Sequence, residues 1–168
     1  MVEVDAASTA EAGYRGPQVC TIVGITYRQL DYWARTDLLR PSICEARGSG
    51  TQRRYSYADL LQLKVIKRLI DAGISLHQSR GAIECLRASG EDVATANLVI
   101  EDKRAVLRSG EEIIDLLRGG QAMLNILPMA GVVSEVDAAI LQFTQAQTEA
   151  AEHAGAPSPA GRSSATGR

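Results

Sequence analysis

The chain has 168 residues, of which 45% are hydrophobic and 23% charged, an ordinary soluble composition with enough residues for one core or two small domains. No apolar run approaches the ~20 residues that cross a bilayer, and the N-terminus lacks a signal-peptide segment, so we expect a cytoplasmic protein with no membrane partner. The net charge is −2, but residues 14–80 hold eleven Lys and Arg against five Asp and Glu. A basic first half joined to an acidic second half indicates a DNA-binding module with a separate partner domain.

Neither a metal site nor a catalytic site is indicated. Cys20, Cys44 and Cys85 lack the spacing of zinc ligands, and both histidines stand apart from them, so we interpret the cysteines as small buried or incidental thiols in a reducing compartment. The chain has no glycine-rich phosphate loop, no nucleophile–base pair and no carboxylate pair with supporting context. We therefore expect no enzyme activity and no cofactor.

The first half of the chain begins with a predicted helix-turn-helix. Residues 1–13 are small and acidic without periodicity, and we expect a disordered arm. A short helix should cover residues 16–23, with proline in its first turn, where a missing N–H costs nothing. After a tight turn at residues 24–25, Thr26 and Gln29 have the spacing of a capping box and begin a second helix. In this arrangement the second helix reads DNA.

The predicted reader helix has two unlike faces. Leu30 and Trp33 share one face and should enter the core, whereas tyrosine and arginine occupy the other. Arginine bonds phosphates or guanine edges, and tyrosine hydroxyls reach phosphates. We therefore predict DNA contacts from this face and from the preceding helix, by Gln18, Thr26, Tyr27, Arg28, Gln29, Tyr32 and Arg35.

A basic segment with glycines at its tip follows. Pro41 prevents the helix from continuing, and residues 42–56 contain R-G-S-G-T-Q-R-R-Y. Two short strands around the glycines would form a β-wing whose basic side chains meet the phosphate backbone. The candidate contacts are Arg53, Arg54 and Tyr55. The alternative is a disordered, solvated basic loop.

Two more helices should complete the first half. The third begins at Ser56, with Asp59 at the capping-box position, and ends at Gly73. The fourth begins after Ser75 and reaches about Ala88. Beyond Gly90 we expect three strands, at residues 96–100, 105–107 and 123–127. A short helix should cover residues 111–118 and a last helix residues 132–151, followed by a disordered tail at residues 152–168.

The last predicted helix carries apolar residues at three- and four-residue steps, namely Val133, Val136, Ile140 and Phe143. Two helices are too few to cover both faces of a three-stranded sheet, so we assign dimerisation to residues 91–151. The competing possibility is that this surface packs back on the fourth helix of the same chain.

The order of helix-turn-helix, wing, helix, G-I-S-L and helix resembles the N-terminal domain of the MerR family of transcriptional regulators. The resemblance is carried by V-C-T-I-V-G-I-T-Y-R-Q-L-D-Y-W, L-L-R-P, R-R-Y-S-Y-A-D-L-L-Q-L and D-A-G-I-S-L. It implies a homodimer that binds an inverted repeat at a promoter, and many members distort the DNA for RNA polymerase. Arg28 and Tyr32 match the arginine and tyrosine of the family's reader helix, and Arg53 and Tyr55 match the R-x-Y of its wing.

The chain departs from the family pattern in two places. Asp31 stands where many members have a second arginine, and its carboxylate should pair with Arg35 or Arg28 on the helix surface and lower the phosphate affinity of this helix. The segment after Gly90 looks too strand-rich for the long dimerising helix of metal- and drug-sensing members. Through E-E-I-I-D-L-L-R-G-G-Q-A it is similar to members with a compact α/β C-terminal domain.

The predicted fold is therefore mainly α with small β elements. Residues 14–90 form a winged helix-turn-helix of four helices and a β-wing, and residues 91–151 form a small α/β dimerisation or effector domain. The predicted function is a transcription regulator that binds an inverted-repeat promoter site as a homodimer, with double-stranded DNA, a second copy and RNA polymerase as partners. The alternatives are an architectural or excisionase-like DNA-binding protein and a protein-interaction module that contacts the transcription machinery.

Overall fold

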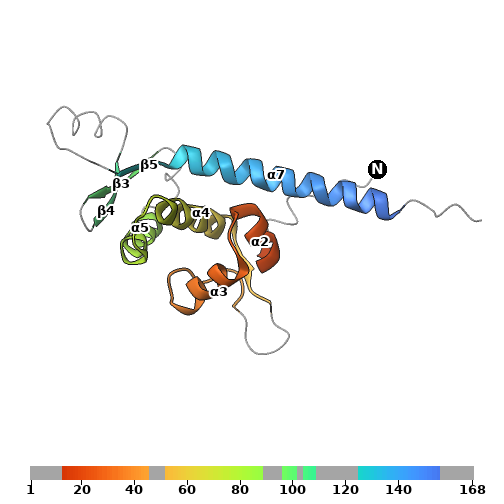
Figure 1. Cartoon of the computed structure of the whole chain (residues 1–168), viewed down its shortest axis with the longest axis horizontal. Coiled ribbons are helices and arrows are strands. Elements are labelled where there is room, and N and C mark those ends of the chain that lie inside the picture. Colours follow the sequence, from red (N-terminus) through yellow and green to blue (C-terminus); the bar gives the residue numbers. More distant parts are fainter. Residues whose placement is uncertain (1–12, 46–51, 89–95, 102–103, 109–124, 156–168) are drawn as a thin grey trace, which may run out of the picture.

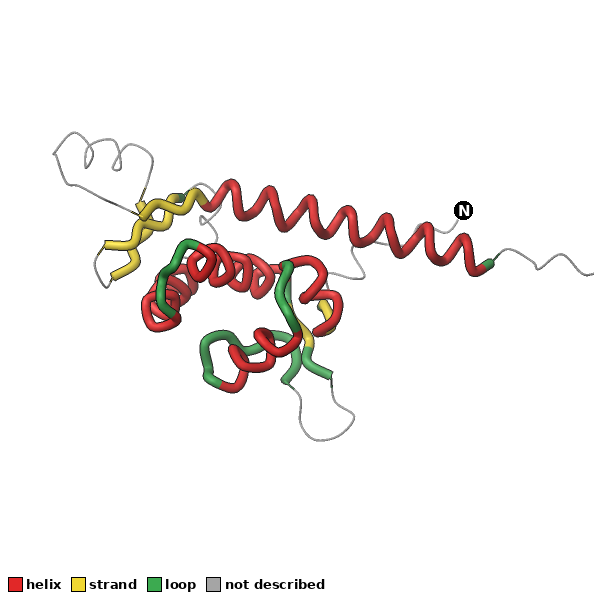
Figure 2. Tube along the Cα trace, viewed as in Figure 1, coloured by secondary structure: helices red, strands yellow, loops and turns green. Residues whose placement is uncertain are grey.

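A computed structural model describes residues 13–45, 52–88, 96–101, 104–108 and 125–155. As predicted, the described part is mainly helical with two small sheets (Figures 1 and 2). In chain order its elements are β1 (Tyr14–Arg15), α2 (Gly16–Val23), α3 (Tyr27–Arg35), β2 (Arg54–Tyr55), α4 (Tyr57–Asp71), α5 (Leu76–Ala88), β3 (Asn97–Glu101), β4 (Arg104–Arg108), β5 (Asn125–Pro128) and α7 (Met129–Ala154).

The helix-turn-helix is set by local signals. Gly24 adopts a left-handed conformation with φ of 79° and ends α2, a conformation that side chains with a Cβ rarely adopt. Thr26 then caps α3: its Oγ1 accepts from the Gln29 N–H at 3.2 Å, and its own N–H donates to Gln29 Oε1 at 3.0 Å. Leu30 and Trp33 are buried beneath the helix, as their spacing predicts.

The start of α4 is tied to the segment that follows α3. Asp59 is buried, and its Oδ2 accepts from the Ser42 N–H at 2.8 Å, the Ser42 hydroxyl at 2.7 Å and the Ser56 N–H at 2.9 Å. Ser56 returns a bond, because its Oγ accepts from the Asp59 N–H at 3.1 Å. The predicted capping box is confirmed, and the same carboxylate also fixes a residue 17 positions earlier in the chain.

The last helix, α7, lies across α2 and α4 (Figure 1). Met129, Val132 and Val136 are buried in the same core as the first half, and Ile140 and Phe143 pack partly against it. The apolar stripe assigned to dimerisation is therefore largely used within one chain, on α2 and α4 rather than on α5. The last helix predicted at residues 132–151 is found and is longer than expected: α7 has 26 residues and extends through Ala154, into the predicted tail.

The second sheet has the antiparallel order β4-β3-β5, in which Leu98 is paired with Leu107 on one side and with Leu127 on the other. The three predicted strands are found within two residues of their expected bounds. This sheet packs against the N-terminal half, because β4 contacts α5. The predicted helix at residues 111–118, the arm up to residue 12 and the tail from residue 156 lie outside the described residues. No helix in the described ranges is long and apolar enough to span a membrane.

Polar contacts hold α7 on α4. Glu135 forms ion pairs with Lys64, at 3.4 Å, and with Arg68. The Tyr57 hydroxyl donates to Asp137 Oδ1 at 2.5 Å, and burial together with this carboxylate raises the pKa of Tyr57 to about 12. These contacts join segments far apart in the sequence and hold the last helix against the N-terminal half.

We expect Asp59→Ala to lower the free energy of unfolding by about 2–3 kcal/mol, because it removes a helix cap together with the shared acceptor of three partly buried hydrogen bonds from Ser42 and Ser56. Urea unfolding of the full chain measures this change. Asp71→Ala, which removes an exposed carboxylate paired with Lys67 on the same helix, is the control and should cost less than about 0.5 kcal/mol. Equal losses in the two variants would contradict the role given to Asp59.

Alkaline pH should weaken the attachment of α7. The folded-state pKa of Tyr57 lies above its ordinary value of 10.0, so the stability that its hydroxyl contributes is complete below pH 10 and is lost as the pH rises through about 12. In Tyr57→Phe, the loss of unfolding free energy between pH 10 and pH 12 should be smaller than in the parent protein. In an absorbance titration of tyrosinate, Tyr57→Phe should show one late-ionising tyrosine fewer than the parent protein. An unchanged titration would refute the raised pKa assigned to Tyr57.

Candidate nucleic-acid interface

The exposed side of α3 carries the predicted reader residues. The side chains of Tyr27 and Tyr32 are 62% and 52% exposed. Tyrosine side chains are usually more deeply buried than this. Arg28 and Arg35 are exposed on the same helix. The structure thus brings together, on one short surface helix, the two residue types that bind phosphates and base edges.

Three of the predicted contacts have a structural task as well. Thr26 and Gln29 bond to each other in the cap of α3, and Gln18 Oε1 accepts from the Arg15 N–H at 2.8 Å in the cap of α2. Their side-chain oxygens are therefore engaged within the protein. Sequence spacing identified the cap formed by Thr26 and Gln29 but not the cap of α2 formed by Gln18, and it could not separate these roles from surface contacts.

The base of the wing differs from the predicted hairpin. The strand β2 pairs with β1, with Tyr14 opposite Tyr55, and on its other side Arg54 forms an isolated bridge with Cys44. The glycine tip itself, residues 46–51, lies outside the described residues. Tyr55 is fully buried, so its ring belongs to the core and not to the exposed surface.

Arg53 connects the wing to the reader helix. Its Nη1 donates to Asp31 Oδ1 at 2.8 Å, and the other oxygen of Asp31 forms an ion pair with Arg35 Nε at 2.9 Å. The predicted partner Arg35 is confirmed, whereas the structure places the wing residue Arg53, and not Arg28, at the second oxygen. The hydrogen bond from Arg53 lowers the pKa of Asp31, and the same bond raises the pKa of Arg53. This hydrogen bond therefore favours the charged forms of both Asp31 and Arg53.

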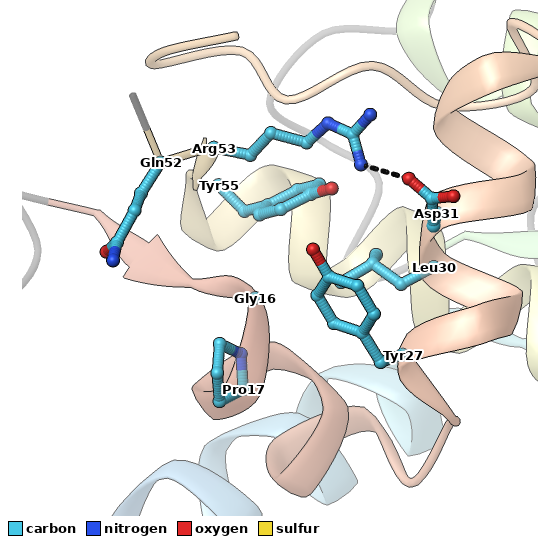
Figure 3. Close-up of a pocket in the computed structure, with 8 residues that line it drawn as sticks. All are labelled: Gly16, Pro17, Tyr27, Leu30, Asp31, Gln52, Arg53 and Tyr55. Carbon is cyan, nitrogen blue, oxygen red and sulfur yellow. Dashed lines mark hydrogen bonds and ion pairs between the residues drawn. The ribbon is translucent and has the colours of Figure 1, made fainter. Parts of the chain in front are cut away.

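A hollow of about 350 Å³ lies between α2, α3 and the base of the wing (Figure 3). Tyr27, Asp31, Gln52 and Arg53 supply its polar side chains. The Tyr55 hydroxyl is buried beside these residues with no hydrogen-bond partner in the described part of the chain, and burial raises the pKa of Tyr55 to about 12. The hollow is open to the surface that carries the reader residues, so it can admit a polar group from a partner.

The far end of α3 is held by a residue that sequence reasoning missed. Arg80 on α5 donates to the carbonyl oxygens of Thr36 at 2.9 Å and Asp37 at 3.0 Å. A positive charge at this position satisfies free carbonyls and complements the negative end of the helix dipole. No sequence signal links residues 43 or 44 positions apart, so only the folded chain reveals this contact.

The described residues contain no group of three or more His, Cys, Asp or Glu side chains that could hold a metal ion. The three cysteines are partly buried and stand on separate elements: Cys20 on α2, Cys44 before the wing and Cys85 on α5.

Comparison with known proteins agrees with this geometry. Residues 14–85 match the family described as MerR HTH family regulatory protein. Over 148 residues the chain is 49% identical to proteins of Mycobacterium bovis and Mycobacterium tuberculosis that are named uncharacterized HTH-type transcriptional regulators. The matched part covers 86% of this chain and 65% of the length of those relatives. Residues 14–85 thus form a MerR-type helix-turn-helix domain, and the chain as a whole is similar to proteins named as HTH-type transcriptional regulators.

Proposed function

We propose that this DNA-binding regulator recognises an inverted-repeat site at a promoter as a homodimer. The observation that carries the proposal is the exposed face of α3, which presents Tyr27, Arg28 and Tyr32 and is joined to the wing through the Asp31–Arg53 ion pair. A single α-helix fits the major groove of B-DNA, and arginine bonded to a guanine edge is the commonest specific contact. RNA polymerase is the further partner expected at such a site, and we expect the protein to act in the cytoplasm.

Arg28 is the residue we assign to base reading. It occupies the second position of α3, and the first turn of a recognition helix is the part that meets base edges in helix-turn-helix proteins. The side chains of both Arg28 and Arg35 are exposed, but Arg35, near the end of the helix, is paired with Asp31. These differences favour separate roles for the two arginines.

A second copy is needed because one module contacts one half-site, and useful specificity requires two half-sites at fixed spacing. The outer part of α7 supports this proposal. Every residue from Thr144 to Ala154 is exposed, and Leu141 is 60% exposed on the preceding turn, outside the apolar stripe that packs on the core. Figure 1 shows this end of α7 extending beyond the helices of the N-terminal half. We propose that a second copy covers Leu141.

Arg28→Ala should weaken binding to the specific site by about 1–3 kcal/mol, because a guanine-edge contact is lost. The site is first identified by genome-wide mapping of bound DNA, and affinities are then measured on that site and on a random duplex. The control is Arg87→Ala, which removes an arginine on α5 that bonds Gln62 and lies outside the reader helix and wing. Equal losses on both duplexes would reduce Arg28 to a phosphate contact.

Leu141→Glu should weaken the dimer at least about tenfold, because it places a charge where an apolar side chain is buried between copies. Sedimentation of the full chain at micromolar concentration measures the change. Gln142→Glu adds the same charge to the neighbouring exposed residue and should have a smaller effect. A monomeric parent protein would exclude the homodimer, and equal effects of the two substitutions would exclude Leu141 from the interface.

A further inference from the structure

We propose that Asp31 is a positioning residue for DNA binding, whose carboxylate holds the wing residue Arg53 beside α3 in an orientation that can receive a DNA phosphate. The inference rests on the proposed function and deepens it. A carboxylate on a DNA-reading helix should by charge alone oppose binding, since it repels phosphate. The geometry around Asp31 gives it the opposite effect.

The two oxygens of Asp31 serve two different arginines. Oδ1 accepts from Arg53 Nη1 at 2.8 Å, which joins the wing to the helix, and Oδ2 pairs with Arg35 Nε at 2.9 Å, four residues along the same helix. One negative charge is thus shared between two guanidinium groups, and the trio has a net charge of +1. An approaching phosphate meets a positive cluster.

The contact with Arg53 is the more sheltered of the two. The side chains of Asp31 and Arg53 are 24% and 25% exposed, whereas that of Arg35 is 73% exposed. A fully exposed ion pair contributes little, because water screens the charges and both side chains lose freedom. The Asp31–Arg53 contact therefore has the greater effect on where a side chain points.

Arg53 keeps the means to bind a second acceptor. Its guanidinium has five N–H donors, of which the bond to Asp31 uses one. Its side chain lines both the 350 Å³ hollow with Tyr27 and a second hollow of about 240 Å³ with Arg40 (Figure 3 shows the first). A phosphate can reach the guanidinium while Asp31 remains bonded to it.

Holding Arg53 in place lowers the entropy lost when DNA binds, because a long side chain is already ordered in the free protein. Direct base reading by Asp31, for example of a cytosine amino group, is disfavoured because both of its oxygens are occupied. The role of Asp31 is therefore exerted through Arg53.

The test is Asp31→Asn in the full chain, with a random-sequence DNA duplex long enough for two half-sites one helical turn apart as the probe. Phosphate contacts are present on any sequence, so this probe does not depend on the operator. Charge alone predicts tighter binding, since the substitution removes a negative charge. Positioning predicts binding that is weaker by about three- to tenfold. It also predicts a salt dependence whose slope falls by roughly 1, as one phosphate contact is lost.

Two further variants make the result specific. Arg53→Gln should show the same loss of slope, and the double variant Asp31→Asn/Arg53→Gln should bind no more weakly than Arg53→Gln alone, because both act on one contact. Glu45→Gln removes a carboxylate that pairs only loosely with Arg40, at 3.6 Å, and should leave binding unchanged or slightly stronger.

Tighter binding by Asp31→Asn, or additive losses in the double variant, would overturn the inference while leaving the DNA-binding function intact. Absence of binding by the parent protein to mapped sites and to random duplex would instead reject the proposed function. Thermal unfolding of each variant is measured alongside. Arg53→Gln removes the same contact from its other side, so a folding defect in one variant leaves the other as the test.

Discussion

The arrangement of the N-terminal half depends on the hydrogen bonds that the buried carboxylate of Asp59 accepts. By accepting three hydrogen bonds from Ser42 and Ser56, it joins the segment after α3 to the first turn of α4. The wing leaves and re-enters the fold between these two serines, so both of its ends are held by one side chain. Removing this acceptor is costly because three partly buried hydrogen bonds are lost together. The position of Arg53 beside α3 follows from this constraint.

The C-terminal segment is attached to the DNA-reading half at two places. The long helix α7 packs on α2 and α4, with Glu135 and Asp137 bonded to α4, and the strand β4 packs on α5. Because Arg80 of α5 also bonds the carbonyls of Thr36 and Asp37, directly after α3, a displacement of α5 would act on the end of the reader helix. The two halves of the chain are thus in continuous physical contact, although charge divides them into a basic and an acidic part.

Much of the fold could be predicted from the sequence because it is encoded in local patterns. Capping boxes at Thr26 and Ser56, and glycines with positive φ at positions 24 and 73, set helix ends through contacts within four residues. The apolar spacing of Leu30 and Trp33 placed the face of α3 that enters the core. The same local logic found the three strands of the second sheet, and it identified the exposed tyrosines and arginines of the candidate interface.

By itself, the sequence therefore determined the order of the described helices, the faces of the reader helix and the family to which the chain is similar. Only the tertiary structure decided which side chains meet across those elements. Asp31 and Arg53 are 22 residues apart, and Arg80 lies 44 residues beyond the carbonyl it binds at Thr36. No helical or strand period links such positions, so packing of the core brings them together. The same reason explains α7: its apolar stripe was visible in the sequence, but α2 and α4 became its partners only when the chain folded.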